Sequence, residues 1–375
     1  MKPLSVYVHI PFCLRKCSYC DFPSFPAPMP LISDYLEALK VEIELYREFL
    51  SLREVETIYF GGGTPSIINS EDLLSLLDLI IPEKQRENKE ITLEANPGTV
   101  NFLSLKELRD GGFNRISLGV QSFLDSELSL LERIHTSKQA FEAFEMAREA
   151  GFSNINLDLI FGLPGQNLGD FLPSLEAAVK LAPEHLSLYC LSLEKGTRLW
   201  TRVQSGELDS PSDETVARMY QKACQAMSLN SYEHYEISNF ARSGYRSRHN
   251  QVYWHYGEYI GFGLEAVSFH DGIRRGNTGK IEQYIARARE RKSPVSYQTG
   301  KKGASALQEE AVLHLRTSDG FREDELAQKY PEAFPAFKKK LEDLREKGLL
   351  LENNGQWHIR EEHFFVSLEI MAQLL

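Results

Sequence analysis

Three cysteines stand close together near the start of the chain, at Cys13, Cys17 and Cys20, separated by three residues and then by two. Three thiolates on one short loop can bind three corners of a cubane [4Fe–4S] cluster. A fully protein-bound cluster needs a fourth ligand, and the next cysteine along the chain is Cys190. The spacing therefore predicts a cluster with one iron open to a small molecule.

Two other interpretations of this loop remain open on spacing alone. The cysteines can be free thiols of a protein in a reducing compartment. They can also hold a structural zinc ion, with His9 as the fourth ligand. The sequence that follows the loop has to decide among the cluster, the free thiols and the zinc ion.

The composition indicates an ordinary globular protein. The 375 residues suffice for two or three domains or for one large barrel with an appendage. The formal net charge of −11 argues against broad nucleic-acid binding, which needs a basic surface, so no nucleic-acid partner is expected. Five cysteines, an odd number, argue against a disulfide scaffold.

The N-terminus runs straight into an expected strand, without the segments of a signal peptide. No apolar run approaches the roughly 20 residues of a membrane span. We therefore expect a cytoplasmic protein, with peripheral membrane contact left open.

Residues 1–231 alternate strand-like and helix-like segments. Strands are expected at about 5–10, 57–60, 91–95, 115–120, 155–160 and 186–191. Helices are expected at about 33–50, from 70 onward, and at 103–110, 137–150 and 211–229, whereas the Pro-rich stretch 22–30 is expected to be loop. This order requires a parallel sheet with helices outside, and we predict an α/β fold, a partial (β/α)6 TIM-like barrel.

The remaining chain is predicted to form two further parts. Residues 232–300 are aromatic and polar together and are expected to connect two domains. Residues 301–375 are expected to form an added α+β, winged-helix-like domain with helices at 308–315, 323–329 and 334–347 and a hairpin at 349–359. The acidic chain argues against DNA binding by that domain, so we expect it to cover the barrel or contact a partner.

Polar residues and glycines follow several of the expected strands, at the barrel mouth where chemistry takes place. The run Gly61-Gly62-Gly63 lets the main chain approach a ligand closely, although such a run is often only a turn. Glu94 can accept hydrogen bonds from a ligand or form a salt bridge with Arg115. Asp158 lies in an apolar strand, where either a ligand or a structural network has to satisfy it.

The cysteine loop and the glycine run together resemble the radical SAM superfamily. The matching motifs are Tyr7-x-His9-x-Pro11-Phe12-Cys13-x3-Cys17-x2-Cys20 and Gly61-Gly62-Gly63-Thr64-Pro65. In that superfamily, S-adenosylmethionine (SAM) completes the open iron of a [4Fe–4S] cluster, and reduction by the cluster generates a radical from SAM. The resemblance implies that the three cysteines bind the cluster and that an electron donor serves it.

The same resemblance implies a set of SAM-binding residues. Gly63 and Thr64 would contact the amino-acid end of SAM, and Tyr7 would lie near the cluster. Arg133 can instead be a solvated helix charge. The complete implied set is Tyr7, Tyr19, Phe22, Gly63, Thr64, Glu94, Gln121, Arg133 and Asp158. No residue is assigned a catalytic role.

Within the superfamily, the chain resembles oxygen-independent coproporphyrinogen III dehydrogenase and its relatives along nearly its whole length. Two departures set it apart from the dehydrogenase: Phe22 stands where that enzyme has a further cysteine, and an N-terminal extension is almost absent. Both features are similar to the radical SAM haem chaperone family (HemW). The run His249-Asn250-Gln251-Val252-Tyr253-Trp254 resembles the HNxxYW signature of that family, and the runs 156–165 and 235–240 also fit it.

His249 is a candidate axial ligand for haem iron, because neutral imidazole binds haem and aromatic neighbours pack against a porphyrin. Alternatively, His249 is a histidine of the protein core. His255 is a second candidate ligand for haem iron. His9 is expected to hydrogen-bond near the cluster. Cys190 and Cys224 are expected to pack as small apolar residues.

The favoured hypothesis is a haem chaperone on a radical SAM barrel, which delivers haem to acceptor proteins. One alternative is the dehydrogenase, which oxidatively decarboxylates coproporphyrinogen III in porphyrin biosynthesis. Another is a binding module with structural zinc. Whether the chain is an enzyme stays open at this point.

Overall fold

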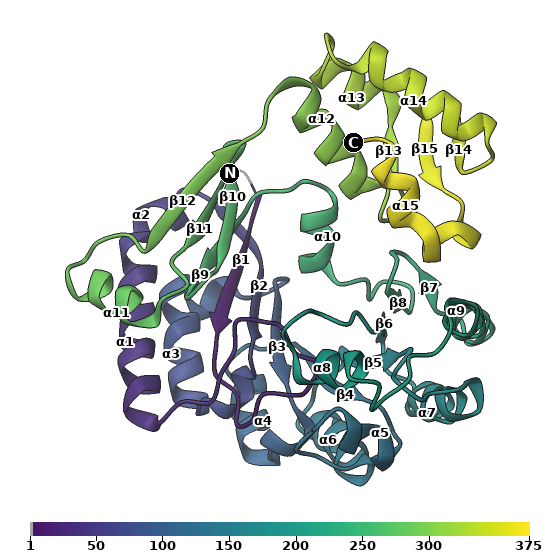
Figure 1. Ribbon diagram of the computed structural model, residues 1–375. Helices are drawn as coiled ribbons and strands as arrows, with labels where there is room; N and C mark the ends of the chain where they lie inside the picture. The colour runs from purple at the N-terminus through teal and green to yellow at the C-terminus, as the bar shows by residue number, and fades with distance from the viewer. Residues whose placement is uncertain (1–2) are drawn as a thin grey trace.

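The computed structural model describes residues 3–375, in which six strands and their connecting helices come first (Figure 1). The strands are β1 (Pro3–Ile10), β2 (Glu54–Gly62), β3 (Glu90–Ala95), β4 (Arg115–Gln121), β5 (Ile155–Phe161) and β6 (His185–Cys190). Each pairs in parallel with the next. β1 and β6 pair with later strands rather than with each other, so the barrel stays open. The predicted partial (β/α)6 barrel is confirmed.

Helices connect these strands. They are α1 (Met29–Leu45), α2 (Arg47–Ser51), α3 (Ser70–Ile80), α4 (Phe102–Asp110), α5 (Asp125–Leu130), α6 (Ser137–Glu149), α7 (Leu168–Leu181), α8 (Arg198–Gln204) and α9 (Asp213–Leu229). Short 3-10 turns lie at η1 (Pro65–Ile67), η2 (Glu83–Gln85) and η3 (Pro97–Thr99). Side chains of Asn69, Asn101 and Thr136 accept hydrogen bonds from the first turns of α3, α4 and α6, which fixes where these helices begin.

One helix start differs from the prediction. The Pro-rich stretch 22–30 was expected to be loop throughout, but α1 begins inside it at Met29. Pro30 lies in the first turn of α1, where the missing N–H costs no intrahelical hydrogen bond and the fixed φ of proline suits the helix. Only the part of the stretch before Met29 remains non-helical.

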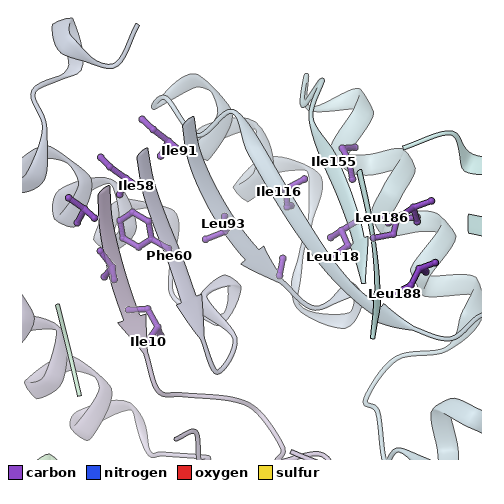
Figure 2. Packing of buried hydrophobic residues seen from close by; sticks show 14 of the residues in the cluster. Ile10, Ile58, Phe60, Ile91, Leu93, Ile116, Leu118, Ile155, Leu186 and Leu188 are labelled. Carbon is purple, nitrogen blue, oxygen red and sulfur yellow. The ribbon is translucent and has the colours of Figure 1, made fainter. Parts of the chain in front are cut away.

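The core lies between the strands and the surrounding helices. Alternate strand residues, such as Ile116 and Leu118 of β4, are fully buried there (Figure 2). The residues between them face the inside of the barrel, because successive side chains of a strand point to opposite faces. Ser117 and Asp158 do so and hydrogen-bond to each other at 3.0 Å. The strands therefore present apolar groups to the core and polar groups to the interior.

Residues 232–300 form strands β7 (Glu233–His234), β8 (Asn239–Ala241), β9 (Tyr259–Phe262), β10 (Val267–His270), β11 (Ile273–Asn277) and β12 (Val295–Gly300), with helices α10 (Arg248–Trp254) and α11 (Ile281–Arg289). The expectation of a connecting segment is corrected, because β8 pairs with β6 and β9 pairs with β1. The sheet thus runs in the order β12-β11-β10-β9-β1-β2-β3-β4-β5-β6-β8-β7. The unpaired edges of an open barrel offer hydrogen-bonding groups that these later strands use.

Residues 301–375 form a smaller unit beside the barrel (Figure 1). It contains α12 (Gly303–His314), β13 (Phe321–Arg322), α13 (Glu323–Lys329), α14 (Phe334–Glu346), β14 (Leu350–Asn353), β15 (Gln356–Ile359), η4 (Glu361–Val366) and α15 (Ser367–Ala372). Three helices and a hairpin thus lie within a few residues of the predicted ranges. The Ser318 N–H donates to the Tyr235 carbonyl at 3.0 Å, which ties this unit to the barrel.

None of the helices within residues 3–375 is long and apolar enough to cross a bilayer.

Candidate functional site

The cysteine loop lies at the C-terminal end of β1, where its main chain is held from two sides. The Cys13 N–H donates to the Phe25 carbonyl at 3.3 Å, and the Ser18 N–H donates to the Leu131 carbonyl at 3.1 Å. The loop borders a cavity of about 360 Å³ at the strand ends. Eleven of the residues named from sequence line this cavity: Cys13, Cys17, Tyr19, Cys20, Phe22, Gly63, Thr64, Glu94, Gln121, Arg133 and Asp158.

The side chains around the cysteine loop bear on both the cluster and the zinc interpretation. Within residues 3–375, no three His, Cys, Asp or Glu side chains are grouped as ligands of one metal ion. His9 has both ring nitrogens in hydrogen bonds, Nδ1 with the Tyr7 hydroxyl at 3.0 Å and Nε2 with the Pro23 carbonyl at 3.1 Å. It therefore hydrogen-bonds beside the loop, as predicted, and is not free to bind zinc. In a cluster each thiolate binds a different iron, so three separated thiols around one cavity suit it.

The glycine run of β2 packs against the cysteine loop. A Cβ on Gly62 would lie 2.5 Å from the His9 ring, and one on Gly63 would lie 2.5 Å from the Phe12 carbonyl oxygen. The sequence predicts main-chain groups that point at a ligand. The N–H groups of Gly63 and Thr64 instead donate to carbonyls of Ile10 and Phe12, both at 2.8 Å. The run therefore joins the loop to β2 while still bordering the cavity.

Glu94 ties β3 to the glycine run. Its carboxylate accepts hydrogen bonds from the Tyr59 hydroxyl at 2.8 Å and from the Gly62 N–H at 3.0 Å. The predicted alternative, a salt bridge with Arg115, is not among the ion pairs of the described chain. Burial raises the pKa of Glu94 to about 7, because the charged carboxylate loses its hydration. Glu94 is thus poised to change its charge near neutral pH.

Asp158 is satisfied by its neighbours. The Asn156 amide donates to it at 2.8 Å and the Ser117 hydroxyl at 3.0 Å. Burial nevertheless raises its pKa. The structural network expected as one alternative is therefore present, and Asp158 also borders the cavity.

Arg133 lies beside the cysteine loop and not on a solvated helix face. Its Nη1 donates to the Cys17 sulfur at 3.3 Å, and its Nη2 donates to the Asn96 side chain and, at 2.7 Å, to the Gly119 carbonyl. Its Nε is buried and has no hydrogen-bond partner among the described residues. A guanidinium in this position stabilises negative charge on the thiolate.

Gln121 and three aromatic residues complete the predicted set. Gln121 ends β4 with φ of 67°, a left-handed conformation that non-glycine residues rarely adopt and that is concentrated at functional sites. Tyr19 borders the cavity, and burial raises the pKa of its hydroxyl. Phe22 is 61% exposed at the cavity wall. Tyr7 is outside the cavity lining and packs against Tyr59, with ring centroids 6.2 Å apart.

His249 lies buried in the barrel interior, with protein partners for both ring nitrogens. Its Nδ1 hydrogen-bonds to the Thr57 hydroxyl at 2.7 Å and its Nε2 to the Tyr253 hydroxyl at 2.8 Å. The residue is 2% exposed, and its ring stacks on Tyr59 at 5.0 Å. Burial lowers its pKa to about 3. These contacts are those of the core histidine expected as one alternative, and the role of His249 as a haem ligand stays a prediction.

Some residues of the cavity wall were not found from sequence. Asn96 hydrogen-bonds to both Arg133 and Thr64. In the sequence, only the position of Asn96 directly after β3 indicates that it belongs to the cavity wall. Cys190 was expected to pack as a small apolar residue, but it is exposed and borders the cavity at the end of β6. Cys224 is half-buried, with its sulfur 3.9 Å from His234 Nδ1.

Comparisons with known proteins identify the family of the chain. The model of the radical SAM superfamily matches residues 7–178. A heme chaperone HemW of Bacillus subtilis is 36% identical over 374 residues, 99% of each chain. The HemW of Escherichia coli is 39% identical over 278 residues, 72% of each chain. The solved structure of the E. coli coproporphyrinogen III oxidase HemN, a radical SAM enzyme, has a TM-score of 0.86 at 24% identity and covers 100% of this chain and 90% of that one. At this identity, the likeness to HemN shows the fold alone.

Proposed function

The chain belongs to the heme chaperone HemW family, within the radical SAM superfamily, and we propose that it binds haem and transfers it to haem-accepting proteins in the cytoplasm. The observation that carries the proposal is the alignment with the B. subtilis HemW over 99% of both chains, which includes the barrel and the C-terminal unit. Phe22 supports it further. The dehydrogenase pattern has a cysteine at this position, where the chain presents an exposed phenyl ring.

The cavity residues fit the two cofactors that the superfamily implies. Cys13, Cys17 and Cys20 would hold a [4Fe–4S] cluster, and three thiols leave one iron open for SAM. When bound, this pair supplies one-electron chemistry, for which an external electron donor is needed. The protein's own contribution is to place a guanidinium beside Cys17 and a buried carboxylate, Glu94, at the same cavity.

The direct test measures haem handling and porphyrinogen turnover in parallel on the full chain after anaerobic cluster reconstitution. We expect a new Soret band on titration with haem, and transfer of that haem to a haem-free cytochrome. Incubation with coproporphyrinogen III, SAM and a reductant is expected to give no decarboxylated product. Absence of haem binding would refute the proposal. Porphyrinogen turnover would favour the dehydrogenase instead.

Binding of SAM is expected to depend on pH through Glu94. Below about 7 the Glu94 carboxyl is mostly neutral, and above that pH it is charged and a better acceptor for ribose hydroxyls. The affinity for SAM should therefore rise between about pH 6 and about pH 8. Isothermal titration calorimetry of the reconstituted protein measures this affinity at each pH. The Glu94→Gln variant should bind SAM more weakly, and its affinity should not rise with pH. If the affinity of the variant for SAM still rises with pH, a group other than Glu94 causes the pH dependence.

A further inference from the structure

Arg115 is a buried cation on the inner face of the barrel. It begins β4 and is 1% exposed. In the register of the sheet it lies opposite Thr92 of β3, and Ser117 follows it two residues later on the same face of β4. Ser117 borders the cluster cavity and hydrogen-bonds to Asp158. Arg115 therefore lies inside the barrel, one layer of side chains below the cavity wall.

The Arg115 guanidinium has no carboxylate in contact with it. Its Nε is buried and has no hydrogen-bond partner among residues 3–375, and Arg115 makes no ion pair in this described part of the chain. Arg86, another buried arginine, is paired with Asp78 by contrast. Because arginine stays protonated in proteins, the charge of Arg115 has to be balanced by negative groups at a longer distance.

Two carboxylates of the barrel interior can balance this charge. Glu94 follows Thr92 by two residues and so shares its face of β3, and Asp158 lies on β5. Burial raises the pKa of Glu94 to about 7, and the charge of Arg115 opposes this rise. Burial also raises the pKa of Asp158, against its hydrogen bonds and the same Arg115 charge. Both carboxylates border the cluster cavity, so Arg115 acts on the charge of the cavity wall without lining the cavity itself.

The other titratable groups of the interior do not replace Arg115 as the cation that faces these carboxylates. Burial lowers the pKa of His249 to about 3 and that of His185 as well, and Arg115 lowers both further, so both imidazoles stay neutral. Arg133 borders the same cavity, but its guanidinium donates to the Cys17 sulfur. The remaining groups that face either carboxylate are tyrosines whose pKa values burial raises: Tyr7, Tyr19, Tyr59, Tyr189 and Tyr253.

We propose that Arg115 is a positioning residue for the SAM site, whose buried positive charge keeps Glu94 and Asp158 ionised so that they accept hydrogen bonds from the ligand. Without this cation, burial and the mutual repulsion of the two carboxylates favour a proton on one of them. A charged carboxylate binds ribose hydroxyls and a sulfonium better than a neutral carboxyl does. The inference rests on the proposed function in one respect, since it takes SAM as the ligand of this cavity.

The first test measures the affinity of the reconstituted full chain for SAM across pH. Arg115→Gln should move the rise of affinity with pH upward by about one pH unit and weaken binding at pH 7 about fivefold. Arg115→Lys keeps a positive charge and should retain the wild-type pH profile. Arg86→Gln is the matched control, because Arg86 is also buried but lies outside the cavity lining, so its variant should keep the wild-type profile.

The second test needs neither SAM nor the cluster. Infrared difference spectra recorded across pH detect protonated carboxyl groups, and the band that disappears in Glu94→Gln belongs to Glu94. In Arg115→Gln this band should persist to a pH about one unit higher than in the wild type. Glu42 provides an internal reference. Burial raises its pKa to about 7 too, but its carboxylate accepts hydrogen bonds from Tyr284 and Asn277, so its band should not move.

An unchanged titration of Glu94 in Arg115→Gln would overturn the inference and leave the proposed function intact. An equal shift in Arg86→Gln would also overturn it, because it would indicate a general structural effect. If Arg115→Gln does not fold, Arg115→Lys decides alone: an unchanged Glu94 titration supports the inference, and a shift like that expected of the neutral variant overturns it. A wild type that binds neither SAM nor haem would refute the proposed function, and the infrared titration would still decide the role of Arg115.

Discussion

The Cys17→Ala variant is expected to lose the iron–sulfur cluster almost completely. Three thiolates hold a cluster at three irons, and removal of one leaves two irons without protein ligands. Cys17 also carries the hydrogen bond from Arg133 at 3.3 Å, so the same substitution leaves a buried guanidinium without its sulfur partner. Iron and acid-labile sulfide after anaerobic reconstitution, together with the broad visible absorption of the cluster, measure the loss.

Cys224→Ala is the matched control for this experiment. Cys224 is also half-buried but lies beside His234, away from the cluster cavity, so its variant should keep the wild-type iron and sulfide content. Retention of a full cluster by Cys17→Ala would contradict the assignment of this thiol. Recovery of zinc without iron or sulfide in the wild type would revive the structural zinc interpretation.

The Gly63→Ala variant is expected to be destabilised and to lose cluster and SAM binding together. A Cβ at this position would lie 2.5 Å from the Phe12 carbonyl oxygen and 3.0 Å from that of Ile10. Both obstacles are backbone atoms, which cannot rotate away as a side chain does. Because the Gly63 N–H donates to the Ile10 carbonyl, relief of the clash must separate β2 from the cysteine loop. Overpacking of this kind costs about 1–3 kcal/mol of unfolding free energy.

Gly98→Ala provides the comparison for Gly63→Ala. Gly98 lies in η3, directly after Asn96 and Pro97, and its nearest contact for an added Cβ is an ordinary 3.5 Å. This variant should keep wild-type unfolding in urea and wild-type cluster content. Equal behaviour of the two variants would show that the approach of Gly63 to the loop has no energetic consequence.

Local patterns predicted most of the barrel. All six parallel strands and the helices of the C-terminal unit were found within a few residues, because alternation and helical periodicity record burial along a single element. The exceptions have physical causes. The start of α1 at Met29 was missed because proline is excluded from helix interiors but suits the first turn. The pattern of residues 232–300 predicts only a connecting segment, because their strands are short and the partners of these strands lie far away in sequence.

The same limit applies to individual site residues. His249 and Tyr59 are 190 residues apart in the chain, and only their stacking in the barrel interior makes His249 a core residue. Arg133 and Cys17 are separated by 116 residues, so no local pattern distinguished a solvated helix charge from a cation beside the thiol. The glycine run was recognised, but the direction of its N–H groups was not, since these depend on the position of the cysteine loop.

The sequence by itself determined the cysteine loop, the order of strands and helices, and the family. Each depends on residues that are close together in the chain, and their spacing is a local property. Only the tertiary structure decided which side chains meet. It placed Arg133 against Cys17, buried both nitrogens of His249, and brought His255 and His314 together where α10 and α12 are in contact. Such contacts depend on how distant elements pack, which no periodicity along one element records.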